Sequence, residues 1–232
     1  QLSSGYLVEY DFGAASITLH AGAGTRSTFV SDADHSTIYG ISNSIFWQSS
    51  VFTVGTGITA THTDKPDPYG GASLLNILPV GAVSADGSIF VQGSELLVRN
   101  SSLNTLASLN SAFADTRGMV FNSTGDRLYV LHGTGAIVVF DTATWLPVAV
   151  YDAGIIPVYP LPLFDPKPGY GDILDISAND QMLAVMGTSG VQMISVADMV
   201  PYATNGDDII IRTGTIFALA GNDLSDSTTN GS

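Results

Sequence analysis

The chain has 232 residues, and its 7 lysines and arginines stand against 21 aspartates and glutamates, which gives a formal net charge of −14. This excess of negative charge repels nucleic-acid phosphates and anionic lipid headgroups. No apolar run approaches the roughly 20 residues that cross a bilayer, so the sequence argues against nucleic acid as a partner and against membrane insertion. The absence of cysteine excludes disulfides, thiolate metal sites and a cysteine nucleophile.

The composition also predicts where the protein is located. Strong acidity, few lysines, no cysteine and many Ser, Thr, Gly and Asn residues are typical of a secreted, extracellular bacterial protein. Gln1 does not begin a signal peptide, so we expect a processed product or an excised part of a longer protein.

The first predicted elements are two strands, residues 5–11 and 17–20, which parallel residues 135–141 and 148–151 later in the chain. A longer unit follows, which begins with a segment at residues 25–31 that repeats at residues 116–122, and continues with a turn at 32–35 and a strand at 38–41. Two further strands are predicted at 45–47 and 51–54. Residues 62–71 contain Pro66 and Pro68 and are predicted to form a long loop.

The next unit is predicted to begin near Leu74 and to end with a strand at residues 106–109. It is followed by the clearest stretch of the chain, residues 116–154, where four short apolar runs are separated by three polar turns. A second proline-rich insertion, residues 155–170, cannot supply a regular ladder of backbone donors. A last unit spans residues 173–196.

The same turn recurs in four of these units, as VSDAD, VSADG, FNSTG and ISAND, starting at residues 30, 83, 121 and 176. A blade of a β-propeller takes about 40–45 residues, and the two longer intervals are those that contain the proline-rich loops. The pair Thr25-Arg26 also returns as Thr116-Arg117 before the equivalent strand. The sequence therefore predicts an all-β chain folded as a β-propeller.

The turn Ser84-Ala85-Asp86-Gly87 and the strand Leu128-Tyr129-Val130 resemble the YVTN, lactonase-like and NHL group of propeller repeats. That resemblance covers roughly residues 5–200. It implies a fold and no particular activity.

The tail has two interpretations. In the first, residues 209–221 align with the start of the 116–154 unit, while residues 5–20 align with its second half. The two termini would then form one composite blade and close a ring of five blades, which removes exposed sheet edges. This interpretation gives a single domain over residues 1–222 and a flexible polar tail at 223–232.

In the second interpretation, the tail resembles the entry to RTX (haemolysin-type) repeats, which bind calcium. The resemblance implies Ca²⁺ as the one candidate cofactor, with Asp207, Asp208, Asn222 and Asp223 as its ligands. The glycine-rich copies that normally complete such a site are missing, so we expect weak calcium binding at best.

No sequence motif identifies a catalytic centre, because the chain has no G-x-S-x-G elbow, no H-E-x-x-H, no P-loop and no dinucleotide fingerprint. A hydrolase would have to use His35 beside Asp34, or His62 and Asp64 in the first long loop. Carboxylates of this kind more often cap the backbone of their own turns.

Two arginines at equivalent positions, Arg26 and Arg117, form another candidate. They would either bind an anionic ligand at the mouth of the channel or tie neighbouring blades together by hydrogen bonds. Trp47, Trp145 and Tyr202 could stack on a sugar or could simply pack between blades.

The sequence favours a secreted, non-enzymatic propeller that binds a protein or carbohydrate ligand through residues 62–72 and 155–171. The alternatives are a lectin-like propeller and an extracellular lactonase or glycosidase.

Overall fold

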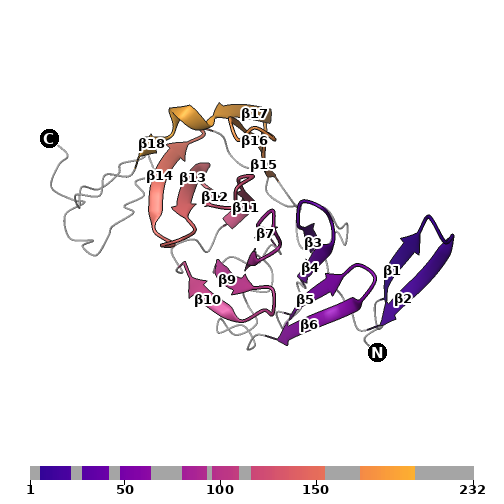
Figure 1. The fold of residues 1–232 in the computed structure, drawn as a ribbon. Helices are drawn as coiled ribbons and strands as arrows, with labels where there is room; N and C mark the ends of the chain where they lie inside the picture. Colours follow the sequence, from indigo (N-terminus) through magenta and orange to yellow (C-terminus); the bar gives the residue numbers. More distant parts are fainter. Residues whose placement is uncertain are drawn as a thin grey trace, which may run out of the picture.

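The computed structural model describes residues 6–21, 28–41, 48–63, 80–92, 96–109, 116–154 and 173–201. These residues form four antiparallel sheets that fan out as four blades, together with one two-stranded hairpin (Figure 1). The predicted all-β propeller is therefore confirmed. The predicted number of five blades is wrong for the described residues, because the N-terminal strands pair only with each other among them.

The hairpin and the first two blades occupy the N-terminal half. The hairpin consists of β1 (Tyr6–Asp11) and β2 (Ser16–Ala21). The first blade consists of β3 (Thr28–Ser31), β4 (Thr37–Ile41), β5 (Gln48–Thr53) and β6 (Gly57–Thr63). The second consists of β7 (Gly81–Val83), β8 (Ile89–Gln92), β9 (Leu97–Asn100) and β10 (Thr105–Ser108).

The other two blades follow in chain order. The third blade consists of β11 (Thr116–Phe121), β12 (Arg127–His132), β13 (Ala136–Asp141) and β14 (Pro147–Asp152). The fourth consists of β15 (Leu174–Ile176), β16 (Met182–Gly187) and β17 (Gly190–Ser195). A 3₁₀ turn, Val196–Asp198, then leads to β18 (Val200–Pro201), which pairs with the outer strand β14 as a fifth strand of the third blade.

The first strand of each blade lies innermost, and β3, β7, β11 and β15 contact one another in that order. The hydrophobic core lies between the sheets. One cluster joins the second and third blades through residues such as Val91 and Val138, and another joins the third and fourth through Ile137 and Leu183. Continuous apolar runs such as Ile137 to Phe140 are explained by this stacking, because both faces of the third blade are covered.

The first blade corrects one part of the sequence prediction. Its third and fourth strands are Gln48–Thr53 and Gly57–Thr63, whereas the sequence placed them at 45–47 and 51–54. The reason is the turn between them, where Gly55 and Gly57 have φ of 76° and 97° and allow a tight reversal that apolar patterning does not show. As a consequence, His62 lies in a strand and not in a loop.

Candidate functional site

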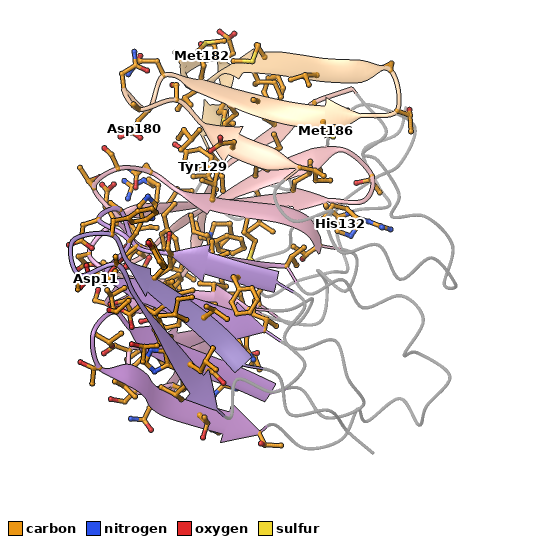
Figure 2. All side chains as sticks on the ribbon, turned by 90° about the vertical axis from the view of Figure 1, so that its right-hand side faces the viewer. Asp11, Tyr129, His132, Asp180, Met182 and Met186 are labelled. Carbon is orange, nitrogen blue, oxygen red and sulfur yellow. The ribbon has the colours of Figure 1, made fainter. Side chains whose placement is uncertain are left out.

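The propeller has two rims with different construction. The turn rim carries the four inner turns, residues 32–36, 84–88, 122–126 and 177–181, which connect the first and second strands of each blade. The loop rim lies at the opposite strand ends, from which the connections between blades leave at residues 64–79, 110–115 and 155–172. Figure 2 shows Asp11 and Asp180 at the turn rim and His132 on the side toward the loop rim.

All four inner turns use the same hydrogen bond. The first residue of each turn accepts, through its side-chain oxygen, the backbone N–H five residues later, at 3.0 Å, 3.0 Å, 2.9 Å and 2.9 Å. These four accepting residues are Asp32, Ser84, Asn122 and Ser177. The recurring turn pattern of the sequence pairs Ser31 with Ser84. In the structure the first blade is shifted by one residue, so that Asp32 takes this position.

The fourth residue of every inner turn adopts a left-handed backbone conformation. Gly87 and Gly125 do so with φ of 70° and 72°, and His35 and Asp180 do so with φ of 59° and 58°. Glycine adopts this conformation without steric cost, and a residue with a Cβ atom does not. The recurrent pattern of the sequence is therefore a repeated turn geometry.

Hydrogen bonds connect the inner turns of neighbouring blades. Ala33 N–H donates to the Ala85 carbonyl at 3.0 Å, which joins the first and second blades. Between the third and fourth blades, the N–H and hydroxyl of Ser123 donate to the two carboxylate oxygens of Asp180, at 2.9 Å and 2.5 Å. The polar groups of the turn rim thus stabilise the assembly of the blades.

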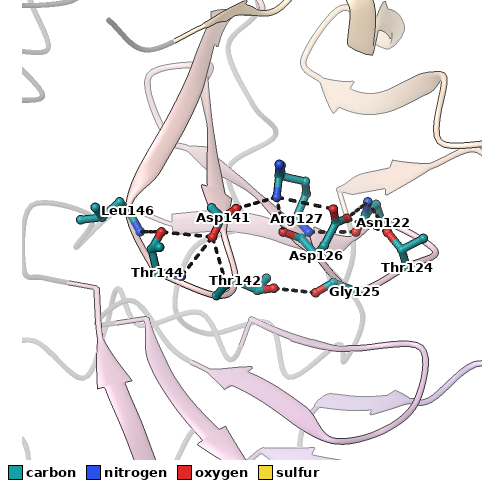
Figure 3. Close-up of polar contacts among 10 residues, drawn as sticks. Asn122, Thr124, Gly125, Asp126, Arg127, Asp141, Thr142, Thr144 and Leu146 are labelled. Atoms are coloured by element: carbon teal, nitrogen blue, oxygen red, sulfur yellow. Dashed lines mark hydrogen bonds and ion pairs between the residues drawn. The ribbon is translucent and has the colours of Figure 1, made fainter. Parts of the chain in front are cut away.

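The outer turn of the third blade is tied to its inner turn in a similar way (Figure 3). Arg127 Nη1 donates to Asp141 Oδ2 at 2.8 Å, and the Thr142 hydroxyl donates to the Gly125 carbonyl at 2.9 Å. Both turns therefore form one hydrogen-bonded unit at this rim.

Carboxylates of the turn rim are held in their charged form. The pKa of Asp34 is lowered mainly by the backbone N–H of Ser36, and that of Asp86 mainly by the hydroxyl of Ser84. The pKa of Asp126 is lowered mainly by the hydroxyl of Thr124. A glycosidase acid requires a raised pKa, so these aspartates suit capping and not proton donation.

Those predicted site residues that the structure describes do not come together. His35 is exposed at the turn rim, where its Nδ1 is hydrogen-bonded to the Ser31 hydroxyl at 2.7 Å. His62 lies near the other end of the same blade, in β6 at the loop rim. Arg117 is buried in β11.

The remaining candidates lie outside the described residues: Arg26, Asp64, Asp207, Asp208, Asn222 and Asp223. In the described ranges, no three His, Cys, Asp or Glu side chains gather as a metal site. The same ranges contain no helix that is long and apolar enough to cross a membrane.

The loop rim contains buried polar residues that the sequence analysis missed. Gln92 ends β8 and His132 ends β12, and both are buried. The Ser49 hydroxyl of the first blade donates to Gln92 Oε1 of the second. Thr116 is buried at the start of β11 beside His132, with which it pairs. In the sequence, Gln92 and His132 are each a single polar residue at the end of an apolar run. Such a residue normally indicates only that the strand ends there, so it does not predict a buried polar side chain.

The fold and its two rims place the chain in the class of β-propellers. No protein-family model matches the sequence, and no curated protein matches it. A crystal structure of the RRP9 WD40 repeats is similar to it with a TM-score of 0.44 and 16% sequence identity, over 54% of this chain and 38% of that chain. The matched part is thus less than half of that chain. Kinship with YVTN, NHL or RTX repeats stays a prediction.

Proposed function

We propose that this chain is a non-enzymatic interaction module, secreted by a bacterium, that binds a protein partner through its loop rim. The supporting observation is the contrast between the rims. The inner turns share one geometry, and hydrogen bonds join those of the first and second blades and those of the third and fourth, whereas the insertions that lengthen the repeat leave from the opposite rim. Surface loops on a rigid scaffold are where binding residues concentrate.

The alternatives have less support from the described residues. The two histidines considered for a hydrolase, His35 and His62, lie at opposite rims and do not share one site, and the lowered pKa of Asp34 does not suit it to donate a proton. Of the aromatic residues that the sequence offers for sugar stacking, Trp145 packs partly buried against the core between the second and third blades, and Trp47 and Tyr202 lie outside the described residues.

Photo-crosslinking tests the proposal, with two threonines of one hairpin as a matched pair. Thr63 is exposed at the loop rim and Thr56 is exposed at the turn rim, so the same crosslinking amino acid can replace either. Mixed with proteins of the extracellular medium, the chain labelled at position 63 is expected to form specific protein adducts, identified by mass spectrometry, and the chain labelled at position 56 is not.

A second set of experiments distinguishes protein binding from the lectin and enzyme alternatives. Replacing residues 64–79 and 155–172 by short Gly-Ser linkers is expected to abolish those adducts. Binding on a glycan array without protein adducts would support the lectin instead. Turnover of a lactone or glycoside panel would support the enzyme and refute the proposal.

A further inference from the structure

The fourth blade is one strand short of the other three among the described residues. Each of the first three blades has at least four strands, whereas the fourth consists of β15, β16 and β17 alone. After β17, the chain does not add a fourth strand but passes through the turn Val196–Asp198 to β18, which pairs with β14 of the third blade. Strand β17 therefore borders the fourth blade, and within the described part of the chain it pairs only with β16 (Figure 1).

The edge of β17 lacks the features that normally protect a sheet edge. Natural edge strands are protected by bulges, by charged residues or proline, or by another segment that covers them. The pairings of the outer strands β6, β10 and β14 with their neighbours each contain a register shift, and β14 is also covered by β18. By contrast, β16 and β17 pair without a shift, and β17 (GVQMIS) contains no charged residue and no proline. Its outer edge is thus a regular template for one more strand.

An exposed apolar face adjoins this edge. Met186, Val191 and Met193 project from one face of the sheet, because Val191 pairs with Met186 and Met193 lies two residues further along β17. These three side chains are 42%, 62% and 56% exposed, whereas Ile194 on the opposite face is buried against the third blade. A strand added at the edge would place its own side chains next to Val191 and Met193, and cross-strand apolar pairs of this kind stabilise sheets.

The charges around the edge indicate the kind of segment that fits it. Residues 173–201 contain three aspartates, Asp175, Asp180 and Asp198, and no lysine, arginine or histidine. Asp198 is exposed and follows the end of β17 closely, so an antiparallel strand would begin beside it. A basic N-terminal end would therefore be attracted to this position, whereas a second copy of the chain, with its net charge of −14, would be repelled.

We propose that the outer edge of β17 and the exposed face of Met186, Val191 and Met193 form a strand-acceptor site for an extended segment of a basic partner protein. The segment adds as an antiparallel fourth strand, with lysine or arginine at its N-terminal end and apolar side chains at alternate positions. Backbone hydrogen bonds to β17 supply the affinity, and the side chains beside Val191 and Met193 supply the specificity. The site lies along the outer flank of the fourth blade, so it is a second interaction surface that does not depend on the loop rim.

A synthetic peptide tests the site, with two lysines followed by alternating valine and threonine and a fluorescent label for anisotropy titration with the full chain. Met193→Lys and Leu106→Lys are a matched pair, because the two side chains are 56% and 54% exposed on the edge strands β17 and β10. We expect Met193→Lys to weaken binding at least about tenfold, since lysine on an edge strand opposes strand addition, and Leu106→Lys to change it less than about twofold. Equal effects of the two substitutions would overturn the proposal.

Asp198→Lys separates recognition of charge from a loss of fold. In this variant, the peptide with two N-terminal lysines is expected to bind at least about fivefold more weakly than to the unsubstituted chain. A peptide with two glutamates in place of the lysines is expected to bind the variant more tightly than the unsubstituted chain. A loss of fold would weaken the binding of both peptides. Any result other than this exchange of preference would overturn the proposed charge and orientation of the segment.

Hydrogen exchange locates the bound peptide and identifies any other occupant of the edge. Alternate amides of residues 190–195 point to the open edge, and the peptide is expected to slow their exchange while leaving residues 57–63 of β6 unchanged. Absence of peptide binding up to millimolar concentration would overturn the proposal, as would slow exchange of all these β17 amides without peptide. Protection that disappears on dilution, together with a dimer mass in light scattering, would assign the edge to a second copy. Protection that does not depend on concentration would assign it to another segment of the same chain.

Discussion

At the scale of single residues, His35 occupies a backbone conformation that suits glycine better. The equivalent residues of the second and third blades are Gly87 and Gly125, and His35 adopts φ of 59° with only an exposed hydrogen bond to Ser31 in return. We expect His35→Gly to raise the free energy of unfolding by about 0.5 kcal/mol in urea denaturation, since relief of the left-handed strain slightly exceeds the entropy cost of glycine.

Asp180→Gly is the matched control, because Asp180 has the same backbone conformation but accepts two hydrogen bonds from Ser123. We expect this variant to lose stability. A stabilised Asp180→Gly, or a destabilised His35→Gly, would show that the left-handed position does not govern these turns.

Tyr39 connects the first two blades and gives them a pH dependence. Its buried hydroxyl donates to the Gly87 carbonyl at 2.6 Å, and its ring stacks on Phe90. Burial, with a smaller contribution from the charges of Asp32 and Asp86, raises its pKa from 10.0 to about 12. The folded state therefore keeps the proton longer than the unfolded state.

The stabilisation linked to this proton is fully present below pH 10.0 and is lost as the pH rises to about 12. We expect Tyr39→Phe to cost about 1 kcal/mol at pH 7, because the Gly87 carbonyl loses a buried donor. The same variant is expected to reduce the fall in stability between pH 10 and 12, measured by denaturation at each pH. An unchanged alkaline profile would contradict the assignment.

At the scale of elements, sequence reasoning was most accurate where both faces of a blade are covered. The four strands of residues 116–154 were predicted within a few positions, because buried apolar runs and polar turns alternate there. Strands β5 and β6 were misplaced because the reversal at Gly55 to Gly57 depends on backbone conformation. Strand β18 was missed because a two-residue pairing with β14 leaves no periodic pattern.

The candidate site was harder to predict than the fold. His35 and His62 belong to the same blade, yet the up-and-down course of its antiparallel strands places them at opposite rims. The buried Gln92 and His132 depend on tertiary packing between blades, which one sequence does not reveal.

The contribution of the hydrogen bonds between Ser123 and Asp180 to stability, which join the third and fourth blades, can be measured directly. The Ser123 hydroxyl donates to Asp180 Oδ2 at 2.5 Å. In a double-mutant cycle with Ser123→Ala and Asp180→Asn, we expect a coupling energy of about 0.5–1 kcal/mol, at the low end for a charged hydrogen bond because the pair is exposed to solvent. Additive effects in urea denaturation would mean that the contact does not stabilise the blade interface.

At the scale of the whole molecule, the inner strands approach so closely that a methyl group between them should disturb the packing of neighbouring blades. A Cβ atom on Gly118 of β11 would lie 2.9 Å from Leu174 Cβ and 3.2 Å from Leu174 N in β15. We expect Gly118→Ala to destabilise the fold by about 1–3 kcal/mol, because it overpacks a contact with backbone.

Gly81→Ala is a suitable comparison in the thermal unfolding of both variants. Its nearest clash is with the flexible end of the Ile41 side chain, at 2.5 Å. We expect a smaller loss of melting temperature than for Gly118→Ala. A larger loss of melting temperature for Gly81→Ala than for Gly118→Ala would show that the close spacing between β11 and β15 does not determine the stability of the fold.

Thermal unfolding with and without calcium tests the interpretation of the C-terminal tail as a calcium-binding segment. The described residues contain no cluster of metal ligands, and Asp207, Asp208, Asn222 and Asp223 lie outside them. We expect the melting temperature to be the same in chelator and in millimolar calcium. A gain of several degrees that Asp223→Ala abolishes would instead indicate a working site, since calcium 100-fold above its Kd would add about 2.7 kcal/mol.

The unequal rims have a consequence for how such a protein can diversify. The described hydrogen bonds between neighbouring blades at the turn rim each involve a residue of a short inner turn, as in the bonds from Ser123 to Asp180 and from Tyr39 to Gly87. Changes in the opposite connections leave those bonds intact. A combinatorial library randomised only in residues 64–79 and 155–172 should therefore yield mostly folded members. Exchanging these two segments could then give the same fold new binding specificities.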